Sequence, residues 1–257
     1  MLKALHDPQD GVLYVVGLMS GSGTNLRRIL EHEQNLNTEG GGSPFRIVAI
    51  FSDRADSQAS AIGKDFDRPV LIRDIGAFYR QRGRPRNDLV LRAEFDAATV
   101  AMLSPFKARA AVYAGYMSIA TKPLIEAFLG INVHPADLAV ELDGRRCYVG
   151  DHAVRDAIVA GETVLRATTH LIEPEVDGGR LLMRSPAINV ELPEGIELST
   201  TEGRAKAESH NQERLKRAGD WVVFPATLEA LARGRFAQDE QGRLYFDGQP
   251  AFKGVAL

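Results

Sequence analysis

The sequence predicts an α/β fold, a single doubly wound and mostly parallel sheet followed by a long C-terminal helix and a β-hairpin. Apolar runs without alternation occur at residues 12–18, 45–51 and 108–114, as is typical of strands buried on both faces. Stretches with helical periodicity and turns rich in glycine, serine or proline separate these runs. Such alternation favours parallel strands joined by right-handed helical crossovers.

The first half of the chain is predicted to alternate strands with helices in an unbroken series. Ser52 and Asp53 are expected to cap the second helix, because short polar side chains accept hydrogen bonds from the first free N–H groups of a helix. Pro135 should end the last strand of the series, since it has no N–H for a ladder. The expected strands are 12–18, 45–51, 69–72, 108–114 and 129–133, and the expected helices run from about 25 to 36, from 53 to 66, from 88 to 103 and from 122 to 128.

The second half begins with a long loop, 137–148, that contains a turn at Asp143-Gly144. A helix from 150 to 160, a strand at 163–172, an acidic loop at 173–179 and a strand at 180–190 should follow. Residues 199–202 are expected to cap a long helix to 233, bent at Pro225, and residues near 243–246 should form the hairpin. No linker separates two parts, so residues 1–257 are expected to form a single domain with a flexible N-terminus at 1–11.

Composition excludes several classes of protein. The chain is 44% hydrophobic and 25% charged, and its 31 basic and 34 acidic residues leave a formal net charge of -3, which does not favour nucleic acid or a membrane surface as a partner. No apolar run approaches the roughly 18 residues of a membrane span, and the N-terminus does not resemble a signal peptide. The single cysteine, Cys147, fits a reducing compartment, and we expect a cytoplasmic protein.

Asn132 and His134 stand together at the end of the expected strand 129–133. Side chains two positions apart lie on the same face of a strand, although such a pair is more often structural than catalytic. Asp177, in a loop before two glycines, is the best candidate for a third group, because a carboxylate raises the pKa of an imidazole and fixes its tautomer. An amide donor beside an imidazole and a carboxylate suits transfer of a carbonyl carbon between two nitrogens, without a metal.

Residues 20–26, Ser-Gly-Ser-Gly-Thr-Asn-Leu, join the first strand to the first helix. Free N–H groups and the positive end of the helix would make this loop an anion site. The loop is neither a Walker motif, because no lysine follows the second glycine, nor a dinucleotide fingerprint, because the spacing differs. The alternative is that this loop is an ordinary tight turn between a strand and a helix.

Other polar groups carry weaker hypotheses. His152 and His170 could join His134 as zinc ligands, but no closely spaced pair supports a metal site. Nothing around Cys147 indicates a nucleophile. The arginines between Arg80 and Arg86 form either a solvated loop or an electrostatic rim for an anionic ligand.

The chain resembles the formyltransferase superfamily that uses 10-formyltetrahydrofolate, and within it is most similar to the glycinamide ribonucleotide (GAR) formyltransferases of purine synthesis. The resemblance covers roughly residues 12 to 250. It rests on the ordered set of motifs at 20–26, 114–117 (Ala-Gly-Tyr-Met), 132–135 (Asn-Val-His-Pro), 150–152 (Gly-Asp-His) and 170–179.

This resemblance implies a role for each motif. Formyl would pass from 10-formyltetrahydrofolate, a co-substrate, to the amine of a phosphorylated small molecule, with no metal. Residues 12–130 would form a phosphate-binding half and residues 131–250 a catalytic and folate-binding half. The expected partners are small-molecule substrates, with a homodimer left open. The implied catalytic residues are Asn132, His134 and Asp177; the phosphate-binding residues Gly21, Ser22, Gly23, Thr24 and Asn25; the folate-binding residues Arg92, Met117, Ser118, Ile119, Glu173 and Val176; and the supporting residues His152, His170 and Asp220.

The chain departs from the family pattern on the substrate side. Ser118 replaces the usual arginine, residues 136–149 are longer and lack the usual prolines, and Asp220-Trp221 replaces a Glu-His pair. The acceptor could therefore be water, a sugar-nucleotide amine or a tRNA in place of GAR, or the protein could bind folate or a phosphorylated metabolite without turnover. We expect neither the regulatory domain of the hydrolases, since only 11 residues precede the first expected strand, nor the C-terminal barrel of the tRNA enzymes, since the C-terminal part is expected to be helical.

Overall fold

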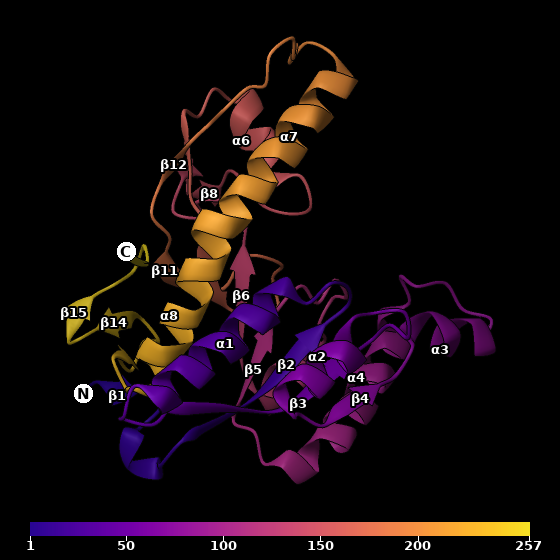
Figure 1. The fold of residues 1–257 in the computed structure, drawn as a ribbon, viewed down its shortest axis with the longest axis vertical. Coiled ribbons are helices and arrows are strands. Elements are labelled where there is room, and N and C mark those ends of the chain that lie inside the picture. The colour runs from indigo at the N-terminus through magenta and orange to yellow at the C-terminus, as the bar shows by residue number, and fades with distance from the viewer.

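The computed structural model describes residues 1–257, and an eight-stranded sheet in the order β16-β11-β10-β6-β5-β2-β3-β4 runs through its centre (Figure 1). All neighbouring strands are parallel except β10, which is antiparallel to both β6 and β11. The predicted α/β fold with a mostly parallel sheet is thus confirmed. The strands are β2 (Leu13–Met19), β3 (Phe45–Ser52), β4 (Val70–Ile72), β5 (Ala110–Tyr113), β6 (Leu129–His134), β10 (Thr168–Leu171), β11 (Leu181–Arg184) and β16 (Val255–Ala256).

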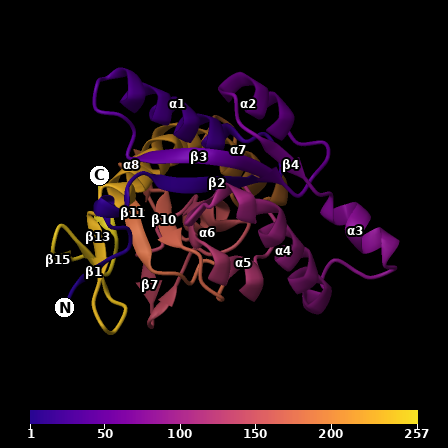
Figure 2. The same ribbon diagram turned by 90° about the horizontal axis from the view of Figure 1, so that it is seen from below.

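Helices cover both faces of this sheet (Figure 2). On one face α1 (Thr24–Thr38), α2 (Ala59–Phe66) and α8 (Trp221–Ala232) pack on β3, while α4 (Leu89–Leu103) and α5 (Lys122–Ala127) lie together on the other. Strand β2 supplies side chains to both cores, Leu13 and Val15 to the first and Val16 and Leu18 to the second. Burial on both faces is the physical reason for its unbroken apolar sequence.

Shorter elements complete the chain. Helix α7 (Thr201–Leu215) projects from the sheet beside α6 (Ala153–Val159), and α3 (Ile75–Gln81) lies at the opposite edge (Figure 1). None of the helices has the length and apolar character needed to cross a membrane. The remaining strands form a four-stranded sheet, β1 (Lys3–Ala4), β13 (Phe236–Gln238), β14 (Leu244–Phe246) and β15 (Gln249–Pro250), and two pairs, β7 (Glu141–Leu142) with β8 (Arg145–Arg146) and β9 (Val164–Leu165) with β12 (Ile188–Asn189).

The predicted start of the second helix is wrong. Helix α2 begins only at Ala59, because Asp53 is buried and its carboxylate accepts a hydrogen bond from the hydroxyl of Ser118. Asp53 is therefore not available as a cap. Helix α3 was absent from the predicted elements; its cap is Asp74, whose carboxylate accepts from the N–H of Ala77.

Two predicted strands are each broken in two. Residues 163–172 divide into β9 and β10, and residues 180–190 divide into β11 and β12. Ala167 lies at the first break and Ser185 at the second. The N–H of Ser185 donates to the carbonyl of Ala167, and the N–H of Ala167 donates to the hydroxyl of Ser185. Pro186, which follows, has no N–H with which to continue the ladder.

The two ends of the chain also differ from expectation. Residues 1–11, predicted to be flexible, contain β1, which pairs with β13. The irregular turn in the long C-terminal helix is a π segment at Lys216–Asp220, whereas Pro225 lies inside α8. Thr200 caps α7, as the sequence predicts.

Candidate active site

Asn132 and His134 lie at the end of β6, in the middle of the sheet. Strand β10 runs antiparallel beside them and places His170 opposite Asn132 and Thr168 opposite His134. Gly130 allows this close packing, since a Cβ there would stand 2.8 Å from Cβ of Ile172 and 3.0 Å from Cε2 of Tyr113. The strand end therefore holds both polar side chains in fixed positions, with His134 only 4% exposed.

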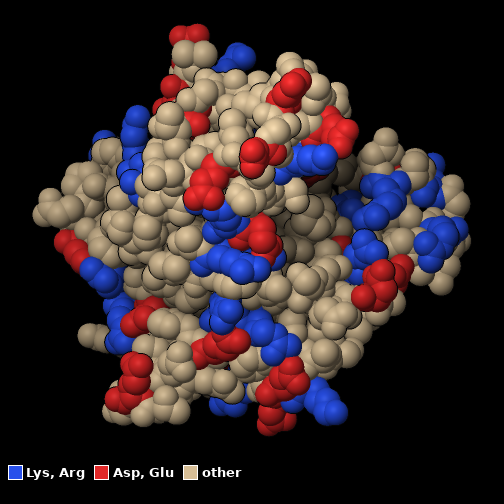
Figure 3. Space-filling view, turned by 45° about the horizontal axis from the view of Figure 1, so that its top comes forward, with Lys and Arg blue, Asp and Glu red and all other residues tan.

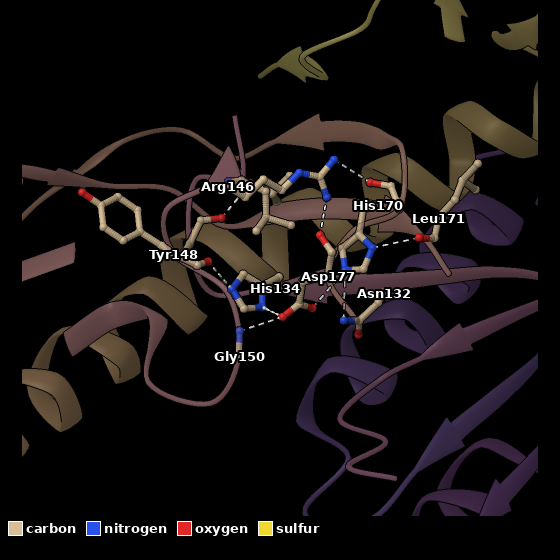
Figure 4. Close-up of polar contacts among 12 residues, drawn as sticks. Asn132, His134, Arg146, Tyr148, Gly150, His170, Leu171 and Asp177 are labelled. Carbon is tan, nitrogen blue, oxygen red and sulfur yellow. Dashed lines mark hydrogen bonds and ion pairs between the residues drawn. The ribbon is translucent and has the colours of Figure 1, made fainter. Parts of the chain in front are cut away.

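Asp177 reaches this strand end from the loop after β10 (Figure 4). Its Oδ2 lies 3.4 Å from Nδ1 of His134, and its Oδ1 lies 3.6 Å from Nε2 of His170. The N–H of Gly150 donates to Oδ2 at 2.9 Å. The three residues that the sequence singled out thus meet in one cluster, together with His170.

Backbone carbonyls set the tautomers of both imidazoles. Nε2 of His134 donates to the carbonyl of Tyr148 at 2.9 Å, which leaves Nδ1 facing Asp177. Nδ1 of His170 donates to the carbonyl of Leu171 at 2.8 Å, so its Nε2 can accept from Nδ2 of Asn132 at 3.3 Å. An amide nitrogen has two hydrogens, and the second one on Asn132 stays free to donate to a bound oxygen.

The charges in the cluster follow from burial and neighbours. Burial tends to raise the pKa of Asp177, but His170, His134 and the N–H of Gly150 outweigh it and lower that pKa to about 2, so the carboxylate is ionised at neutral pH. For His134, burial lowers the pKa below its usual 6.5 and outweighs Asp177 and the Tyr148 carbonyl, which raise it. Asp177 raises the pKa of His134, as the sequence predicts, but desolvation is the larger effect and the pKa is lowered overall. A neutral imidazole with Nδ1 beside an ionised carboxylate can take up a proton during a reaction.

The cluster opens into a cavity of about 710 Å³. Asn132, His134, His170 and Asp177 line it on one side. Asn25 and Asp220 line it elsewhere, and Nδ2 of Asn25 donates to Oδ2 of Asp220 at 3.3 Å. Burial raises the pKa of Asp220 to about 7 against the opposing effects of Asn25 and Lys216, so this carboxyl titrates near neutral pH.

The glycine-rich loop forms a second hollow, of about 280 Å³, that shares Asn25 with the main cavity. Gly21, Ser22, Gly23 and Thr24 line it. Gly23 has a φ of +63°, and a Cβ there would stand 2.5 Å from Cδ1 of Ile62. This tight turn leads directly into α1, whose first N–H groups have no partner within the helix. The loop thus presents free N–H groups in a hollow next to the main cavity, as an anion site requires.

Apolar and acidic side chains also line the main cavity. Met117, Ile119 and Val176 line it and are 74%, 54% and 62% exposed. Exposed apolar side chains of this size suit the face of a flat aromatic ligand. Ser118 and Glu173 also line the cavity; the hydroxyl of Ser118 is bonded to Asp53, and Glu173 pairs with Arg180 at 2.7 Å.

Two predicted site residues line neither the main cavity nor the second hollow. Arg92 is 4% exposed, and its guanidinium lies 5.7 Å from the ring centre of Tyr79 on α3 and 5.9 Å from that of Phe95. His152 turns outward, where its Nδ1 pairs with Glu208 on α7 at 3.0 Å. No group of three or more His, Cys, Asp or Glu residues could hold a metal ion.

The arginine loop is exposed, and Lys and Arg side chains gather on the lobe that carries α3 (Figure 3). Arg84 pairs with Asp88, and the guanidinium of Arg82 lies 3.8 Å from the ring centre of Phe78. These contacts fit the solvated loop that the sequence predicts as one of two alternatives.

Residues 136–149 and 150–152 stand out in the sequence, but the sequence did not predict the contacts by which they frame the cluster. The carbonyl of Tyr148, the N–H of Gly150 and the side chain of Arg146 all contact it. Backbone donors and acceptors carry no residue signature, so only the turn at Asp143-Gly144 signalled that this segment doubles back.

The formyl transferase family model matches residues 13–212. The chain belongs to this family. It is 26% identical to the phosphoribosylglycinamide formyltransferase of Haemophilus influenzae over 234 residues, which cover 90% of this chain and 92% of that protein. It is also 25% identical over 233 residues to the human trifunctional purine biosynthetic protein adenosine-3, but these span only 19% of that longer protein.

Solved structures agree with this family. The glycinamide ribonucleotide transformylase 1 of Symbiobacterium toebii is 25% identical, with a TM-score of 0.65 over 91% of this chain and 94% of that one. The phosphoribosylglycinamide formyltransferase of Coxiella burnetii shares the fold, with a TM-score of 0.69 at 23% identity over 96% of this chain and 99% of that one. The chain is therefore a formyltransferase enzyme.

Proposed function

We propose that this enzyme transfers the formyl group of 10-formyltetrahydrofolate to the amine of a phosphorylated acceptor, with glycinamide ribonucleotide as the first candidate. One observation carries the proposal. The cluster of Asn132, His134 and Asp177 opens into a cavity that shares Asn25 with a glycine-rich anion site. An acceptor with an amine at one end and a phosphate at the other would fit between them.

The chemistry needs an oxyanion donor and a group that can take up a proton. The acceptor amine attacks the formyl carbon, whose oxygen gains negative charge; the bond from this carbon to N10 of the folate then breaks, and the proton lost by the amine ends on N10. The free N–H of Asn132 would donate to the anionic oxygen. Nδ1 of His134 would hold the proton in transit, with the carboxylate of Asp177 at 3.4 Å to stabilise the imidazolium.

Binding roles follow from the lining of the cavity. The exposed apolar side chains of Met117, Ile119 and Val176 would pack against the pterin ring of the folate. The N–H groups of residues 21–25 would hold the acceptor phosphate. Asp220, beside Asn25, would face the middle of the acceptor, where GAR has ribose hydroxyls.

An acceptor panel tests the proposal. Purified protein is incubated with 10-formyltetrahydrofolate and GAR, with a sugar-nucleotide amine, or with no amine, and tetrahydrofolate is followed by absorbance while the formylated product is identified by mass spectrometry. We expect turnover that depends on GAR and a kcat/KM at least about tenfold lower for the same compound without its phosphate, because the anion site would be empty. Equal turnover without amine would make water the acceptor. Tight folate binding with no turnover on any amine would instead indicate a non-catalytic binder.

A further inference from the structure

We propose that Arg146 is a positioning residue for formyl transfer, and that it holds the carboxylate of Asp177 against His134 from the hairpin of β7 and β8. This inference rests on the proposed function of the cluster. Arg146 does not line the cavity and would not touch a substrate. Its effect would pass through the loop that carries Asp177.

Both ends of the guanidinium of Arg146 bind the backbone of this loop (Figure 4). Nη1 donates to the carbonyl of Asp177, and Nη2 donates to the carbonyl of Gly179 at 2.8 Å. A planar fork that binds two carbonyls fixes the direction of the backbone as well as its position. A lysine at this position could offer only a point charge on a flexible stem.

The loop needs such support at Asp177. Asp177 has a φ of +53°, in the left-handed region that residues other than glycine disfavour. The far end of the loop is anchored separately, because the N–H of Leu171 donates to the carbonyl of Arg180 at 2.9 Å and Gly179 packs directly against the carbonyl of Leu171. Arg146 links Asp177, whose backbone conformation is disfavoured, to this anchored end. It therefore opposes relaxation of Asp177 to another conformation.

The same segment holds the other partner of the pair. Four residues after Arg146, the N–H of Gly150 donates to Oδ2 of Asp177 at 2.9 Å. Between them, the carbonyl of Tyr148 accepts from Nε2 of His134 at 2.9 Å. Residues 146–150 therefore fix the backbone and carboxylate of Asp177 and the ring of His134 at once. This segment overlaps residues 136–149, where the chain departs from the family pattern.

The direction in which the pKa of His134 shifts separates a positioning role of Arg146 from a direct effect of its charge. The groups that face His134 are Asp177, His170, Arg146 and the carbonyl of Tyr148. The charge of Arg146 lowers the pKa of His134, whereas Asp177 raises it and has the larger effect. Loss of charge alone would move the pKa of His134 up, but loss of Asp177 from its place would move it down.

The experiment compares Arg146→Met, Arg146→Lys and the control Arg145→Met. Arg145 is exposed on the same hairpin, and its side chain makes no hydrogen bond or ion pair in the structure, so its replacement removes the same charge without releasing the loop. The pKa of His134 is measured by NMR titration of the full-length protein, and kcat and KM are measured with 10-formyltetrahydrofolate and GAR. Circular dichroism checks that each variant is folded.

For Arg146→Met we expect a fall in kcat of about tenfold to 100-fold, the size of effect that a misplacement of about 1 Å can have, with each KM within about twofold. The pKa of His134 should move down, Arg146→Lys should lie between the wild type and Arg146→Met, and Arg145→Met should match the wild type. An unchanged or higher pKa of His134 in Arg146→Met would overturn the inference, as would an equal fall in kcat in Arg145→Met. If Arg146→Met does not fold, the same two outcomes are read from Arg146→Lys.

Failure of the proposed function gives a different result. A wild-type protein with no turnover on any acceptor would refute formyl transfer, while the direction of the shift at His134 would still decide whether Arg146 positions Asp177.

Discussion

Replacement of Asp177 by asparagine removes the charge between His134 and His170 and keeps the size of the side chain. The pKa of Asp177 is lowered from 3.8 to about 2 by these two histidines and by Gly150, against the effect of burial. At about 1.36 kcal/mol for each pKa unit, the ionised carboxylate stabilises the fold by roughly 2 kcal/mol at neutral pH. Because its folded pKa is depressed, this stability is present above the unfolded value of 3.8 and is lost as pH falls through about 2.

Urea unfolding of the wild type and Asp177→Asn measures this contribution. At pH 6 the variant should be less stable by roughly 2 kcal/mol, and at pH 3 the difference should shrink to about half. The kcat for formyl transfer should fall at least about 100-fold, as expected when an imidazole loses the group that stabilises its charge. Equal stability at pH 6, or a kcat close to the wild-type value, would refute the role assigned to this carboxylate.

Two further variants test Asp220, which lines the main cavity, and Gly23, which lines the second hollow. Asp220→Asn should raise the unfolding free energy at pH 8 by up to about 4 kcal/mol, because burial raises the pKa of Asp220 from 3.8 to about 7 and its ionisation then destabilises the fold. Urea unfolding should show this gain at about pH 8 and almost none at about pH 3. Gly23→Ala should lower the unfolding free energy by about 1–2 kcal/mol, because φ is +63° and the added Cβ would meet Ile62, and it should also raise the KM of the phosphorylated acceptor. An unchanged KM in Gly23→Ala would argue against the anion site.

Local patterns predicted the sheet and the position of its polar strand end. The apolar runs indicated burial on both faces, and Pro135 marked where β6 ends, so the sequence alone places Asn132 and His134 at the strand end. These local patterns did not predict that β10 runs antiparallel to its neighbours. Strand direction depends on how the chain returns to the sheet, and the break between β9 and β10 depends on bonds between Ala167 and Ser185.

The electrostatics and the outer parts of the site depended on packing between distant elements. The pKa of His134 is decided by burial, to which the whole surrounding fold contributes. Arg92 is enclosed in part by Tyr79 of α3, a helix that the sequence pattern did not indicate. Asp53 looked like a helix cap in sequence, but it is bonded to Ser118, which lies 65 positions away.

The single-turnover rate of formyl transfer in His134→Ala tests the central claim most directly. With saturating 10-formyltetrahydrofolate and GAR, chemistry is observed without product release, and circular dichroism shows whether the variant is folded. Because His134 would hold the proton that leaves the amine, we expect the rate to fall by about 100-fold or more. A folded His134→Ala enzyme that transfers formyl at the wild-type rate would contradict the assignment of this cluster as the active site.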